Sequence, residues 1–158
     1  MRPRPVPPPV AAVRVACRYD ASVAHVFDAW LDPDVAGRWL FATASRPMTH
    51  VAIDARVGGT FCFADRRNGD NIQHRGEYLR IDRYRRIAFT LVVERCPEVI
   101  TRVAVAFATA AQGCTLNVIH EDLPTAQADY MEGRWTGMLY GLGVTLDCRI
   151  AAFDHQQE

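Results

Sequence analysis

The chain has 158 residues, a length that suits one domain. Its 49% apolar and 23% charged residues match ordinary globular usage and exclude a disordered chain. Because 18 positive and 18 negative residues cancel, the basic excess typical of nucleic-acid binders is absent. All positive residues are arginine, which excludes a catalytic lysine and a lysine Schiff base.

The first nine residues are rich in proline. We expect residues 1–9 to form a flexible tail of polyproline-II character, and residues 10–155 to form a single domain. The prolines interrupt the apolar stretch that a secretory signal needs, and no apolar run reaches the roughly 18 residues of a membrane span. We therefore expect a cytoplasmic protein that makes no membrane contact. A proline-recognition partner for the tail stays open.

The cysteines and histidines lack the spacing of a metal site. Five cysteines without a CxxC motif argue against a disulfide framework or a zinc site, and Cys17, Cys62 and Cys114 fit small buried hydrophobes in strand-like runs. The five histidines contain neither HxH nor HExxH. No GxSxG, GxGxxG or P-loop motif occurs. We expect no metal and no cofactor.

The first third of the chain predicts a strand and two helices. Residues 10–19 alternate between apolar and polar, which indicates a half-buried strand. Ser22 is a plausible N-cap for a helix whose apolar residues repeat at helical spacing as far as Trp30. Pro33 ends this helix and can open a second short helix that runs through Leu40.

Strands dominate from about residue 48 to residue 122. Three turn signals separate them, at Gly58-Gly59, Asn68-Gly69 and Gln112-Gly113. The alternation predicts about six strands, near residues 48–54, 60–63, 72–81, 87–93, 99–107 and 115–121. Consecutive antiparallel strands joined by short turns form a meander.

A long helix is expected from Thr125 to about Phe153. Its apolar residues form one continuous stripe, and a helix of about 28 residues is roughly 42 Å long. Three glycines inside it, Gly133, Gly137 and Gly141, recur every four residues, and we expect close approach of a neighbouring backbone to offset their cost. An antiparallel sheet with one long amphipathic helix is an α+β fold.

The segment Ala21–Pro33 resembles the opening of the START-like (SRPBCC) superfamily, and within it the branch of Hsp90-ATPase-activator homologues (AHSA1 type). Further motifs of that branch follow in the right order over about residues 10–150. They are Gly37-Arg38-Trp39, the hairpin Arg56–Phe61, the pair His74–Tyr78 and Arg85–Thr90, and His120-Glu121 followed by Gly133-Arg134-Trp135. Leu40 departs from the branch, which has a second Trp there, and Trp30 stands where a smaller residue is common.

The resemblance implies a helix-grip fold. In this fold a curved antiparallel sheet of about six to seven strands surrounds a long C-terminal helix, two short helices follow the first strand, and a cavity lies between sheet and helix. A cavity lined by aromatic residues and methionine is typical of small-ligand sites. We therefore expect a small apolar or aromatic ligand.

Periodicity and resemblance together assign the candidate ligand-binding residues. Those expected on the concave face are Phe61, Phe63, Phe89, Leu91, Leu116, Val118, Trp135, Met138 and Leu139. By analogy with the family, Trp39 and Phe41 would lie near the mouth of the cavity. The alternative for all of them is a filled core.

Three polar residues extend this assignment. His120 shares a face with Leu116 and Val118, so it should point inward and could orient a ligand or transfer a proton, and Tyr78 is a similar case. Arg134 could pair with an acidic ligand, but beside a helix start we expect it solvated or bound to an acidic neighbour. His74 and Asp65 lie near hairpin ends, and we expect both to be exposed.

Three functions fit these observations. We favour a non-enzymatic binding protein with an internal hydrophobic cavity and a stress-response or accessory role. The second is an enzyme of the cyclase or hydrolase kind that would use His120 or Tyr78. The third is a chaperone-cofactor-like interaction module, for which homodimerisation through an edge strand or the glycine-rich helix edge would fit.

Overall fold

The computed structural model describes residues 9–42, 48–65 and 72–157, with the side chains described as far as residue 151. The expected proline-rich tail, except Pro9, and the Asn68-Gly69 turn lie outside the described residues. Among the described residues the helices are α1 (Val23–Leu31), α2 (Pro33–Ala36), the 3₁₀ helix η2 (Thr125–Gln127) and α3 (Ala128–Thr145). The strands are β1 (Val10–Tyr19), β2 (His50–Ile53), β3 (Thr60–Asp65), β4 (Ile72–Asp82), β5 (Arg86–Val93), β6 (Thr101–Ala110), β7 (Gly113–Pro124) and β8 (Ile150–Gln157).

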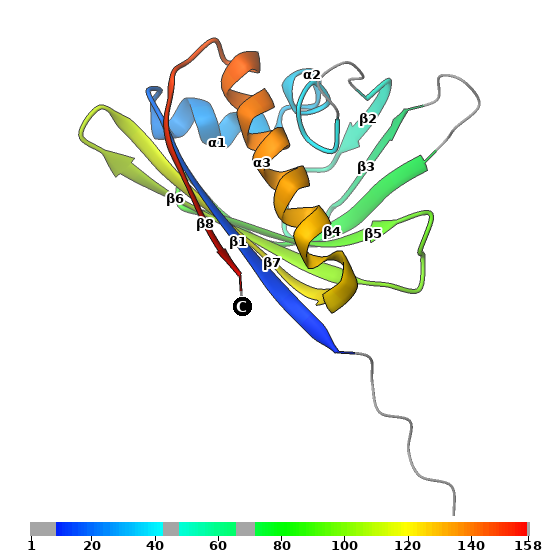
Figure 1. Cartoon of the computed structure of the whole chain (residues 1–158). Helices are drawn as coiled ribbons and strands as arrows, with labels where there is room; N and C mark the ends of the chain where they lie inside the picture. Colours follow the sequence, from blue (N-terminus) through cyan, green and yellow to red (C-terminus); the bar gives the residue numbers. More distant parts are fainter. Residues whose placement is uncertain (1–8, 43–47, 66–71, 158) are drawn as a thin grey trace, which may run out of the picture.

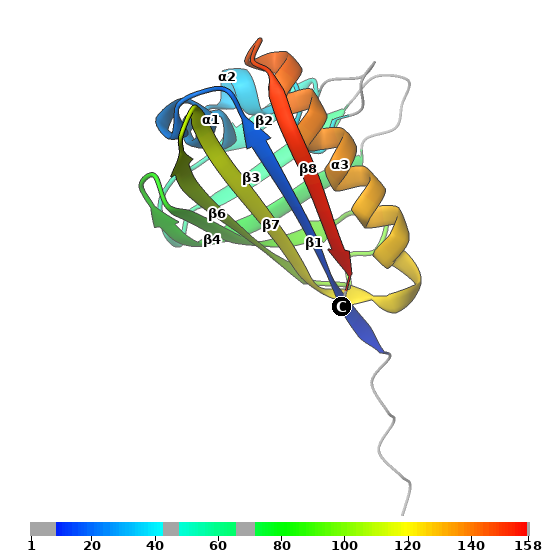
Figure 2. The same cartoon turned by 60° about the vertical axis from the view of Figure 1, so that its left-hand side comes forward.

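The eight strands form one antiparallel sheet in the order β2-β3-β4-β5-β6-β7-β1-β8. The meander from β2 to β7 follows the chain order, as the alternation and turn residues predict. The sheet is strongly curved and α3 crosses its concave side (Figure 1, Figure 2). The architecture is the predicted helix-grip fold, with one strand more than the six to seven expected.

Local sequence signals position the two short helices. The Ser22 hydroxyl oxygen accepts a hydrogen bond from the backbone N–H of His25 at 3.2 Å, which caps α1. Asp32 caps α2 in the same way, and Pro33 occupies the first helical position. The predicted second helix is too long, because α2 ends at Ala36 and the chain continues through turns to Phe41.

The extra strand comes from the predicted C-terminal part of the long helix. The prediction of a helix to Phe153 is wrong, because α3 ends at Thr145 and the chain reverses through Asp147, which has a φ of 51°. β8 then pairs antiparallel with β1 and covers an otherwise open edge. Ile150 follows Leu146 at helical spacing in the sequence and therefore looked like part of the stripe. In the structure it belongs to β8 and packs over Gly143, near the end of α3.

The glycines of α3 do not share one role. A Cβ added at Gly133 or Gly137 would meet nothing within 4 Å, so the expected close approach of a backbone is wrong at both positions. At Gly141 the neighbour, Trp39, lies at an ordinary 3.6 Å. Only Gly143 is crowded, since a Cβ there would lie 2.6 Å from Ile150 Cγ1.

The core fills the concave side of the sheet. Alternate residues of β1 point into it as predicted, and the Tyr19 hydroxyl donates to the Leu139 carbonyl of α3, which fixes the helix on the sheet. On α3 the buried side chains are Trp135, Met138, Leu139 and Leu142, whereas Met131 near its start is half-buried. The helix is therefore packed closely along its second half and less closely near its first turns.

Candidate ligand-binding cavity

A cavity of about 540 Å³ lies beneath the first half of α3. This volume lies within the range of small-molecule sites. Its apolar wall consists of Phe41, Ile72, Leu91, Val93, Val99, Leu123, Met131 and Met138. Its polar lining consists of His74, Arg95, Cys96, Thr101, His120, Gln127, Tyr130 and Arg134. Strands β4 to β7, the β5–β6 connection and α3 all contribute to it.

Four of the residues chosen from the sequence lie on this wall: Phe41, Leu91, His120 and Met138. Three more, Leu116, Trp135 and Leu139, are fully buried and do not line it. Val118 is also buried, and borders a separate hollow with Arg14 and Asn117. Trp39 lies in the core rather than at a cavity mouth, and its indole N–H donates to the Ala29 carbonyl at 3.2 Å.

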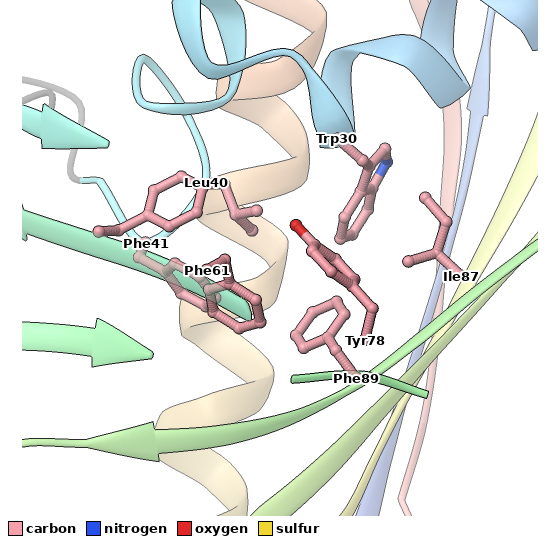
Figure 3. Close-up of a pocket in the computed structure, with 8 residues that line it drawn as sticks. Trp30, Leu40, Phe41, Phe61, Tyr78, Ile87 and Phe89 are labelled. Atoms are coloured by element: carbon pink, nitrogen blue, oxygen red, sulfur yellow. The ribbon is translucent and has the colours of Figure 1, made fainter. Parts of the chain in front are cut away.

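The remaining candidates, Phe61, Phe63, Tyr78 and Phe89, form an aromatic cluster, and Figure 3 shows three of them, Phe61, Tyr78 and Phe89, with their neighbours. The ring centroid of Phe61 lies 5.9 Å from Phe63, 5.4 Å from Tyr78 and 5.2 Å from Phe89. The space left among these rings, Trp30, Leu40 and Ile87 is only about 10 Å³, no more than one water molecule needs. We call this cluster the closed region. Burial holds the pKa of Tyr78 well above its usual range, so its phenol stays protonated.

Phe41 separates the closed region from the cavity. Its ring stacks on Phe61 at 6.1 Å and on His74 at 4.8 Å. Its φ of 60° is uncommon for a bulky residue and strained. Two contacts from α3 hold this conformation, because the Phe41 N–H donates to Met138 Sδ at 3.1 Å and its carbonyl accepts from Arg134 at 3.2 Å.

His120 is held in a fully engaged network. The Trp135 indole N–H, which can only donate, bonds to His120 Nδ1 at 3.0 Å. The ring proton must therefore lie on Nε2, which donates to Thr101 Oγ1 at 2.7 Å, and Thr101 in turn donates to the Leu91 carbonyl. Burial lowers the pKa of His120 from 6.5 to about 4, so the ring is neutral at pH 7.

The prediction that His74 is exposed is wrong, because it is half-buried and lines the cavity. Its Nδ1 is buried and has no hydrogen-bond partner among the described residues. Burial, and then the positive charge of Arg134, lower the pKa of His74 from 6.5 to about 4. The sequence held a signal for this position, since His74 and Tyr78 share one face of β4 at a period of two and Tyr78 was expected to point inward.

Arg134 is half-buried and holds backbone carbonyls instead of an acidic neighbour. Its guanidinium donates to the carbonyls of Phe41 at 3.2 Å and Ala42 at 3.4 Å, and no carboxylate partner is found among the described residues. Met131, Arg134 and Met138 lie three and four residues apart, on one helix face. That spacing could have placed Met131 and Arg134 in the cavity from the sequence, because Met138 was already assigned to it.

Other chemistry is sparse in the part of the chain that the structure describes. All five cysteines are free, with Cys17 and Cys114 buried as predicted, whereas Cys62 is only half-buried and not buried as expected. No group of three or more acidic, histidine or cysteine side chains there could hold a metal ion. None of the helices there is long and apolar enough to cross a membrane.

The comparisons with known proteins agree with this architecture. The model of the family "Activator of Hsp90 ATPase homolog 1-like protein" matches residues 20–147. The chain belongs to this family. The match spans both short helices, β2 to β7 and α3, so it includes every element that lines the cavity, and it confirms the resemblance noted in the sequence.

Solved structures share the fold. Protein SA2116 from Staphylococcus aureus gives a TM-score of 0.80 at 18% identity, over 90% of this chain and 97% of that one. An AHSA1-like protein from Aeromonas hydrophila gives a TM-score of 0.72 at 22% identity, over 86% of this chain and 92% of that one. CalU16 from Micromonospora echinospora gives a TM-score of 0.67 at 26% identity, over 90% of this chain and 81% of that one. The comparison with curated proteins found no match.

Proposed function

We propose that this protein binds a small, largely apolar molecule between the sheet and the first half of α3. The observation that carries the proposal is the 540 Å³ cavity, whose wall combines aliphatic and methionine side chains with a few polar groups. Such a combination provides apolar contact area together with a small number of orienting hydrogen bonds. Methionine suits this role, because its unbranched side chain adapts to ligands of different shape.

The residues proposed to contact the ligand are Phe41, Leu91, Met131 and Met138, with His120 at the inner end. His120 contributes mainly by position, because both of its ring nitrogens are engaged in the network with Trp135 and Thr101. A role in proton transfer would require that network to open. Tyr78 lies in the closed region rather than on the cavity wall. No observation therefore favours the cyclase or hydrolase alternative.

The test is to fill the cavity from the helix. Met131→Trp places an indole ring, larger than the methionine side chain, at a half-buried wall position. Val144→Trp places the same ring on the exposed face of the same helix. We expect binding of an apolar fluorescent dye such as anilinonaphthalene sulfonate, measured by titration, to weaken at least about tenfold in Met131→Trp, a loss of about 1.4 kcal/mol. Val144→Trp should bind the dye as the wild type does.

Equal dye binding by both variants would contradict the proposal, since the dye would then occupy another surface. Circular dichroism of both variants shows whether the fold is retained. A variant that loses the fold is replaced by Val99→Phe, which enlarges a half-buried side chain on the opposite wall, in the connection between β5 and β6.

A further inference from the structure

We infer that the cavity selects a ligand with a carboxylate group, an amphipathic monoacid whose acid group is bound by Arg134 and whose hydrocarbon part fills the apolar wall. This inference rests on the proposed function and names the chemical class of its ligand. It follows from the charges around the cavity, from the free hydrogen-bonding capacity of Arg134 and from the position of His74.

The charged side chains that line the cavity are of one sign. Two arginines, Arg95 and Arg134, line it, and no aspartate or glutamate stands among its described lining residues. The whole chain is neutral, so this local excess of positive charge is a property of the cavity and not of the protein at large. A positive site with apolar walls attracts an anion with an apolar body.

The Arg134 guanidinium carries more N–H donors than it has acceptors among the described residues. A guanidinium carries five N–H groups, and two of them bond to the carbonyls of Phe41 and Ala42. These two bonds fix the plane of the group at the cavity wall, while the other N–H groups find no acceptor among the described residues. Arg134 is half-buried, so water compensates its charge less well than at an exposed position. A carboxylate would supply the missing acceptors, and its match to the guanidinium geometry is close.

His74 lies close to Arg134, and its pKa is sensitive to the charge of that arginine. It stacks on Phe41, whose carbonyl accepts from Arg134, and the charge of Arg134 helps to disfavour its protonated form. Burial is the larger cause of the lowered pKa of His74 and disfavours any unpaired charge there, so a carboxylate would be favoured only through its contact with Arg134, the second cause. His74 itself stays neutral at pH 7, so the favourable charge comes from arginine.

The apolar wall decides what accompanies the acid group. Leu91, Val93, Val99 and Leu123 face the cavity from the strands and their connections, opposite Met131 on the helix. None of these residues offers a polar side chain, so the part of the ligand that lies against them is hydrocarbon, either an alkyl chain or an arylalkyl group. A sugar or a nucleotide would leave its hydroxyl groups without partners along this wall.

The test compares two probes of equal length, decanoate and decanamide, by isothermal titration calorimetry at pH 7. The wild type should bind decanoate at least about tenfold more tightly than decanamide. Arg134→Gln should lower the decanoate affinity at least about tenfold and change the decanamide affinity less than about threefold. Arg149→Gln, which removes an exposed arginine outside the cavity, should leave both affinities unchanged.

The outcomes separate this inference from the proposed function. If the wild type binds both probes equally, or if Arg134→Gln weakens both equally, the carboxylate preference is overturned while the cavity remains a binding site. If neither probe binds and the dye binding is insensitive to Met131→Trp, the proposed function itself fails. Arg134→Lys keeps the charge but not the paired N–H geometry, so it should retain part of the preference for decanoate, and a complete loss would also count against the inference.

Discussion

The closed region and the cavity lie side by side on the same curved sheet, yet one is filled and the other is open. In the closed region, aromatic rings from β3, β4 and β5 meet at centroid distances of 5.2 to 5.9 Å and, with Trp30 of α1, leave about 10 Å³. In the cavity, shorter side chains such as Val93, Val99 and Thr101 face the start of α3 and leave about 540 Å³. Side-chain size contributes to this difference, together with the looser packing of the first turns of α3.

Phe41 forms the boundary between the two. Its backbone strain persists because Arg134 and Met138, both on α3, bind its carbonyl and its N–H. The residues that hold this boundary therefore also line the cavity. A ligand that contacts Arg134 would act on the same group that fixes Phe41, which would link occupancy of the cavity to the conformation of Phe41.

The largest expected effect distinguishes closely packed from loosely packed positions of α3. Trp135→Ala removes a fully buried ring and the donor to His120, and should lower the free energy of unfolding by about 3–5 kcal/mol. Met131→Ala, on the cavity wall, should cost about 1 kcal/mol, since fewer packing contacts are lost. Urea denaturation measures both. Equal losses would mean that the first half of α3 is packed as tightly as the second.

The next effect uses the two histidines that line the cavity, the fully buried His120 and the half-buried His74. Both have a pKa of about 4 in the folded chain against 6.5 when exposed. Below pH 6.5 these histidines bind protons in the unfolded chain but stay neutral in the folded chain. Their contribution to the free energy of unfolding is therefore complete above pH 6.5 and decreases as the pH falls to about 4. The loss should be roughly 3 kcal/mol for each histidine.

Denaturation curves between pH 7 and pH 4 measure this loss. His74→Phe keeps an aromatic ring beside Phe41 and removes one titrating group, so it should remove about half of the pH dependence. An unchanged dependence in that variant would show that His74 is protonated in the folded protein at these pH values.

The smallest effect concerns the outer face of α3. Gly137→Ala adds a methyl group that would meet no atom within 4 Å, and alanine favours the helix, so the free energy of unfolding should rise by about 0.5–1 kcal/mol. Gly143→Ala is the matched contrast, because its methyl group would clash with Ile150 and should destabilise the protein. Thermal unfolding of the two variants should therefore shift in opposite directions. A gain in both would place Ile150 away from the helix.

The sequence was most informative where local chemistry is decisive. Ser22, Asp32 and Pro33 mark helix ends through hydrogen bonds with near neighbours, and alternation placed β1 and the strands of the meander. It failed at the end of α3, because Ile150 continues a helical apolar spacing although it belongs to a strand that packs over the helix. Spacing alone does not distinguish a residue on the helix from one folded back onto it.

The candidate site was predicted in part, for a similar reason. Alternation identified inward residues such as Phe61 and Leu91 equally well, but whether an inward residue borders a void depends on the size of its neighbours across the sheet. Arg134 and His74 lay on faces that the pattern had already assigned, at helical and strand spacing from Met138 and Tyr78. They were placed outside because charged and titratable side chains are usually exposed, and the carbonyls that hold Arg134 come from a segment far away in sequence.

The most direct test of the account observes the methionine methyl groups by NMR during a titration with decanoate. Met131 and Met138 line the cavity, whereas Met48 lies near Gly37 and does not line it. The account predicts that the methyl signals of Met131 and Met138 shift with one common dissociation constant while that of Met48 stays in place. A titration that moves Met48 and leaves Met131 and Met138 unchanged would contradict it, because the ligand would then bind outside the space between the sheet and α3.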